Sequence, residues 1–141
     1  MGDNSARELT GVERQLLADL LGYDFPGVGA LRLQAPGVLA RVGCSCGCGT
    51  IELVTDGYDG ELSDAESPVP VSGEIHDADG TAVGGIMLLL ARGRLDSLEV
   101  YAYLDETLAM PDPGLVTWFR PGGIPADETG QPSPADESDQ P

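Results

Sequence analysis

The residues of this sequence most able to do chemistry are three cysteines in one short run and a single histidine. Cys44, Cys46 and Cys48 follow a C-x-C-x-C order, and His76 is the only imidazole in the chain. In an extended segment this spacing places all three sulfur atoms on one side, because alternate side chains of a strand share a face. Zinc is commonly held by four cysteine and histidine ligands in a tetrahedral arrangement. The four residues therefore form a candidate zinc site, although C-x-C is shorter than the usual C-x2-4-C spacing.

Three other uses of these cysteines stay open. Two neighbouring cysteines of the cluster can form a strained disulfide, a type of bond that is labile and often regulatory. One cysteine can act as a nucleophile if His76 serves as its base. The small thiols can also simply fill a tight, glycine-rich hairpin end. A small metal or thiol-redox module is thus one hypothesis for this chain, and purely structural cysteines are the other.

A second group of polar residues combines carboxylates with tyrosines. Glu99, Tyr101 and Tyr103 alternate along one segment, and Asp105 and Glu106 follow after Leu104. Tyrosine anchors protein interfaces well, because it buries a large area and keeps a polar group. Paired carboxylates can also serve acid–base chemistry, or can form a solvated sheet edge. We favour a partner-binding surface, with the acids pairing to a basic protein.

The charge of the chain limits its partners. The formal net charge is −17, from 24 acidic residues and 7 arginines with no lysine. Nucleic acids and anionic membranes need a basic footprint, so we expect neither as a partner. A field of this sign attracts a basic protein and speeds its association.

The sequence indicates a cytoplasmic protein. No apolar run approaches the length needed to cross a bilayer, and the polar N-terminus has no signal-peptide core. The cysteines number 3, and an odd count argues against a secreted disulfide framework.

Two helices are expected near the N-terminus. Thr10 and Glu13 match a capping box, and so do Ser5 and Glu8, so the sequence offers two starts for a helix. Leucines at helical spacing follow to Leu21, and we predict a helix from about Thr10 to Leu21. Gly22 is a natural stop for this helix. A shorter helix is predicted over residues 27–34.

Alternating and apolar runs predict about five strands. These runs cover residues 38–43, 50–55, 71–78, 86–91 and 96–104. Residues 86–91, IMLLLA, are apolar at every position, so we expect a central strand covered on both faces. Turns are expected at Asp79–Gly80 and at Arg92–Gly93. The predicted fold is α+β: an antiparallel β-meander with the N-terminal helix packed on one face.

The C-terminal third divides into a packed segment and a tail. Residues 115–119 are mostly apolar and include Trp118, the only tryptophan, so we expect them to cover the sheet face that the helix leaves open. Residues 121–141 contain five prolines, five acids and no base. This composition predicts a disordered acidic, proline-rich tail after a single α+β domain over residues 1–120.

Enzyme signatures are missing from the sequence. It contains no phosphate-binding loop, no G-x-G-x-x-G unit and no H-E-x-x-H motif. With one histidine and no lysine, it also has few candidate general bases. We therefore favour a non-enzymatic acidic binding protein, with an immunity or antitoxin-like role as an analogy. The alternative is the metal or redox module.

Four short motifs along the chain together form a family pattern. They are an L-T-x-x-E helix start at residues 9–13, D-F-P-G at 24–27, a C-x-C-G-C turn at 44–48 and L-E-V-Y-x-Y at 98–103. In these motifs the chain resembles a family of small uncharacterised proteins from high-GC bacteria. The resemblance covers most of residues 9–106, implies a shared fold there, and implies no activity or site residues.

Overall fold

A computed structural model describes residues 5–42, 49–104, 106–120 and 124–125. The helical elements are α1 (Gly11–Leu21), α2 (Val28–Gln34), η1 (Ala35–Gly37) and η2 (Pro113–Leu115). The strands are β1 (Arg7–Glu8), β2 (Leu39–Val42), β3 (Ile51–Val54), β4 (Ser72–His76), β5 (Ala82–Ala91), β6 (Arg94–Ala102), β7 (Val116–Arg120) and β8 (Ile124–Pro125).

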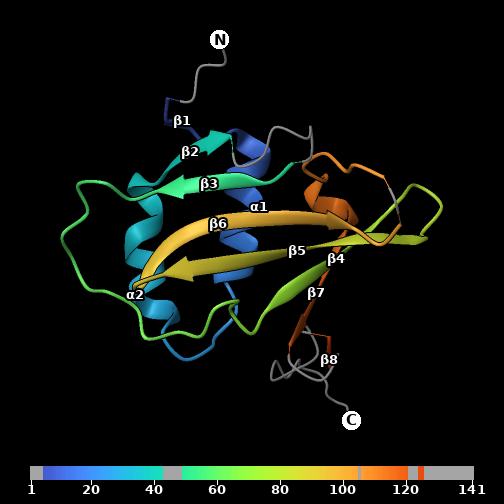
Figure 1. Cartoon of the computed structure of the whole chain (residues 1–141). Helices are drawn as coiled ribbons and strands as arrows, with labels where there is room; N and C mark the ends of the chain where they lie inside the picture. The colour runs from blue at the N-terminus through green and yellow to red at the C-terminus, as the bar shows by residue number, and fades with distance from the viewer. Residues whose placement is uncertain (1–4, 43–48, 105, 121–123, 126–141) are drawn as a thin grey trace.

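The strands form one antiparallel sheet, and both α-helices lie on the same side of it (Figure 1). The order across the sheet is β1-β2-β3-β6-β5-β4-β7-β8, and every neighbouring pair is antiparallel. The α+β class, the antiparallel sheet and the N-terminal helix on one face are confirmed. The five predicted strands correspond to β2 through β6. The additional strands are β7 and the two-residue β1 and β8, which are too short to leave a periodic signal.

The prediction of a simple meander is correct only for β4, β5 and β6. The β2–β3 hairpin joins the sheet beside β6 rather than beside β4, so the chain crosses over between β3 and β4. Local turn signals fix hairpins but not the neighbours of strands that are distant in sequence. Sequence patterns therefore do not predict the pairing of β3 with β6.

The apolar segment at residues 115–119 does not cover the open face, contrary to the sequence prediction. It forms β7, which extends the sheet beside β4 with Trp118 opposite Gly73. Trp118 packs against the buried core on the helix side and is 7% exposed. Of the tail at 121–141, the structure describes only Ile124–Pro125, which pairs with the end of β7.

The helices cover one face of the central strand, and the other face stays partly open. Ile86 and Leu88 of β5 are 0% exposed and belong to the core cluster that includes the leucines of α1. Met87 and Leu89 point the opposite way and are only half-buried. The expectation that both faces are covered is thus wrong for the second face, because no second layer packs there among the described elements (Figure 1).

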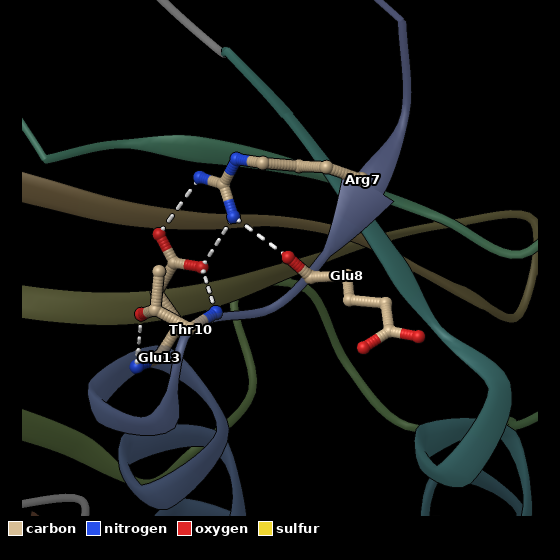
Figure 2. Close-up of polar contacts among 4 residues, drawn as sticks. All are labelled: Arg7, Glu8, Thr10 and Glu13. Atoms are coloured by element: carbon tan, nitrogen blue, oxygen red, sulfur yellow. Dashed lines mark hydrogen bonds and ion pairs between the residues drawn. The ribbon is translucent and has the colours of Figure 1, made fainter.

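A network of hydrogen bonds among Arg7, Thr10 and Glu13 fixes the start of α1 (Figure 2). Thr10 caps the helix by accepting a bond from the Glu13 amide, and its own amide donates to the Glu13 carboxylate at 2.9 Å. Arg7 of β1 donates to both carboxylate oxygens of Glu13, at 2.9 and 3.0 Å. Burial alone would raise the pKa of Glu13, but the bonds from Arg7 and Thr10 outweigh it and lower the pKa below its ordinary value.

Gln34 at the end of α2 ties the helix layer to the sheet. Its amide oxygen accepts a bond from the Leu95 amide at 2.9 Å, and its amide nitrogen donates to the Gly93 carbonyl at 2.8 Å. The ladder between β3 and β6 pairs only Ile51 with Leu98 and Glu52 with Ser97. The Gln34 side chain therefore forms hydrogen bonds with the backbone at the start of β6, where β3 does not pair with this strand.

Candidate functional site

The candidate site is the sheet face turned away from the helices, where β4, β5 and β6 lie side by side. Strand register places Glu74, Gly85 and Tyr101 in one row across these three strands. Because Gly73, Ile86 and Val100 of the neighbouring row are buried against the helix layer, side-chain alternation turns this row to the open side. We call this surface, centred on Glu74, Tyr101 and Tyr103, the tyrosine face.

Tyr101 lies across Gly85. An added Cβ at Gly85 would collide with the ring and hydroxyl of Tyr101, so the ring occupies the space that a side chain at this position would fill. Aromatic residues placed across from strand glycines shield the glycine backbone and strengthen cross-strand pairing. Tyr101 nevertheless remains 40% exposed. Its ring is thus held in place by the sheet while one side stays available for contact.

Tyr103 is positioned by Glu74. Its hydroxyl donates to the Glu74 carboxylate at 2.8 Å, and its amide donates to the Val83 carbonyl at 2.9 Å. Partial burial and the neighbouring Glu74 charge raise the pKa of Tyr103 to about 12. The phenol therefore stays a neutral hydrogen-bond donor at physiological pH. Tyr103 is 49% exposed, and its ring centroid lies 6.2 Å from that of Tyr101 at a 53° tilt.

The same carboxylate also contacts the histidine. The distance from Nε2 of His76 to an oxygen of Glu74 is 3.3 Å. Glu74 thus joins His76 to Tyr103 in a single polar cluster. No local pattern in the sequence indicates this role for Glu74, since the contact depends on the register of β4 against β5 and β6.

Of the other predicted partner-binding residues, only Glu99 shares the open face of the sheet with this cluster. Glu99 is on the same face of β6 as Tyr101, opposite Met87 of β5. Glu106 is exposed in the segment after β6, where its amide donates to the Leu104 carbonyl at 2.8 Å. Asp105 lies outside the described residues. The fold therefore groups Glu99, Tyr101 and Tyr103 with Glu74, while Glu106 follows beyond the end of the strand.

The predicted zinc ligands can be followed only at His76. Cys44, Cys46 and Cys48 fall outside the residues that the structure describes. Within the described ranges, no three metal-binding side chains gather in one place. The zinc site thus stays a prediction.

Comparisons with protein-family models, with curated proteins and with solved structures found no match. No helix in the described part of the chain is long and apolar enough to span a bilayer.

Proposed function

We propose that this chain is a non-enzymatic, cytoplasmic acidic binding protein that recognises a basic protein partner through the tyrosine face. The observation that carries the proposal is the open sheet surface itself. Tyr101, on the inner strand β6, keeps 40% of its surface exposed, and Tyr103, directly after the end of β6, keeps 49%. Rigid aromatic groups on a regular element are typical anchors of protein interfaces.

The tyrosines are ordered before any partner binds, and this favours recognition. The Tyr101 ring packs over Gly85, and the Tyr103 hydroxyl is held by its bond to Glu74. Binding therefore costs little additional side-chain entropy at these two anchors. Half-buried Met87 and Leu89 extend the apolar part of the surface along β5.

The carboxylates supply the preference for a basic partner. Glu74 and Glu99 stand next to the tyrosines, and Glu106 lies past the end of β6. Together with the net charge of −17, they raise the association rate of a positively charged protein in a salt-dependent way. Neutralisation of a basic toxin or effector is the biological role that this chemistry suits, by analogy with small acidic immunity proteins.

An NMR titration with an arginine-rich peptide tests the site. We expect the largest backbone shifts at Glu74, Glu99, Tyr101 and Tyr103, and we expect added salt to weaken the binding. The acidic loop over residues 56–67 provides the internal comparison, since it carries five acids and no base. Shifts concentrated in that loop instead would show that charge alone directs binding, and would remove the tyrosine face from the proposal.

Alanine variants of the two tyrosines test whether these side chains contribute to binding in addition to the negative charge of the surface. Tyr101→Ala and Tyr103→Ala should each weaken peptide binding, because hot-spot truncations at interfaces cost ~2 kcal/mol or more. Tyr58→Ala is the matched control, because Tyr58 packs beside Arg94, where β6 begins, at the opposite end of that strand from Tyr103. Equal loss in all three variants would indicate a general effect on stability.

The competing proposal is a metal or thiol-redox module built on Cys44, Cys46, Cys48 and His76. Metal content and thiol titration of protein purified without chelator distinguish the two. Stoichiometric zinc with no titratable thiol would favour the module. Three free thiols without metal would favour the binding protein.

A further inference from the structure

A second surface, in the helix layer, has the character of a small-molecule site. A hollow of about 380 Å³ lies between α1, α2 and η1. Its apolar lining includes Leu9, Leu17 and Leu21, each almost fully buried. The volume falls near the lower end of the range for small-ligand pockets, which is roughly 300–1,000 Å³. The hollow is thus suited to one small molecule rather than to a protein surface.

The charge of this hollow is opposite to that of the whole chain. Two of the seven arginines, Arg14 and Arg32, line it, and none of the acidic residues that the structure describes does. Arg32 is held by its Nε, which donates to the Leu21 carbonyl at 2.6 Å, and by its Nη2, which lies 3.0 Å from the exposed Asp24 carboxylate. Arg14 is an exposed residue on the surface of α1. The hollow thus combines an apolar lining with the exposed Arg14 and with Arg32, which already pairs with Asp24, and this combination matches a molecule with one anionic end and an apolar body.

We propose that this hollow binds a small amphipathic carboxylate. The apolar body would displace water from the leucine lining, and the carboxylate would pair with Arg14 and the outer edge of Arg32. The acidic residues 126–141 of this chain do not match the site, because their only apolar side chains are alanines and prolines. The site is independent of the proposed function, since it lies in the helix layer and the tyrosine face lies on the other side of the sheet (Figure 1).

Three probes of equal chain length test the charge requirement. Octanoate, octan-1-ol and octylammonium should be titrated into the full-length protein and followed by NMR. We expect octanoate to bind with a Kd on the order of 1 mM, as is reasonable for about ten heavy atoms. Shifts should map to α1, α2 and η1. Octan-1-ol should bind at least about fivefold more weakly, in line with the loss of one exposed charge pair, and octylammonium should not bind there.

Two variants and one control complete the test. Arg14→Gln should weaken octanoate binding about fivefold and leave octan-1-ol binding unchanged. Ala18→Phe fills the hollow from an exposed helix position and should abolish binding of both. Arg41→Gln removes an equal charge from the open side of the sheet, where Arg41 pairs with Glu52, and should have no effect. Equal affinity for octanoate and octan-1-ol, or an Arg14→Gln variant that binds octanoate as the wild type does, would overturn the proposal.

Discussion

The ion pair between Arg7 and Glu13 gives the sharpest test of how the helix layer is stabilised. Glu13→Gln removes the carboxylate charge but keeps an oxygen that can accept the Thr10 amide bond. Arg7 is 44% exposed at its side chain, so its pairing with the 7%-exposed Glu13 lies between a surface and a buried ion pair. We expect a loss of about 1 kcal/mol in the free energy of unfolding. Glu13→Ala also removes the capping bond and should cost about 2 kcal/mol.

Chemical and thermal unfolding of the two variants measures these costs. At roughly 4 °C per kcal/mol for a domain of this size, Tm should fall by about 4 °C and 8 °C. A double-mutant cycle with Arg7→Gln should give a coupling energy of about 1 kcal/mol. Single-mutant costs that add to within roughly 0.3 kcal/mol would refute the pairing of these two side chains.

The pH dependence of the same variants checks the electrostatic argument. The folded-state pKa of Glu13 is lowered below its ordinary value of 4.5. Its contribution is therefore fully present above that value and is lost as the pH falls through the folded-state pKa. The stability gap between wild type and Glu13→Gln should close in that acidic range. A gap that stays constant to low pH would contradict the lowered pKa.

Three further predictions follow from other contacts. Gln34→Ala should cost about 1–3 kcal/mol and speed hydrogen exchange at the Leu95 amide, because that buried donor loses its acceptor. Glu74→Gln should bring the pKa of Tyr103 down from about 12 toward its ordinary value of 10.0, as measured by phenolate absorbance. The stability linked to this phenol is present below pH 10 in the wild type and lost as pH rises through 12. Gly73→Ala should lower stability by about 1–3 kcal/mol and change the fluorescence of the single tryptophan, because the added Cβ collides with three packed side chains.

Local patterns were sufficient for the elements and their turns. Of the two capping boxes in the sequence, the one at Thr10 and Glu13 starts α1, and the Arg92–Gly93 turn joins β5 to β6 as predicted. Both residues of that turn have positive φ, 55° and 78°. The alternation along β6 also predicted that Tyr101 and Tyr103 would be accessible. These features depend on residues that are close in sequence.

Contacts between distant segments could not be derived in this way. To predict the bond from Tyr103 to Glu74, one must know the register of three strands. To predict β7 beside β4, one must decide whether an apolar segment joins the sheet as a strand or packs across its face. Composition alone could not make that choice, because a strand added to the sheet and a segment covering its face both require apolar residues such as Trp118. The contact of Gln34 with the β6 backbone was missed for a similar reason, since a single glutamine at a helix end has no periodic signature.

The order of the strands has a consequence for how the chain folds. The β4–β5–β6 unit is made of neighbours in sequence, so its hairpins can close rapidly. Joining β3 to β6 and β7 to β4 requires much longer loops, whose closure entropy slows these steps. We therefore expect the three central strands to nucleate the domain, and the β2–β3 hairpin and β7 to be added later, one at each flank.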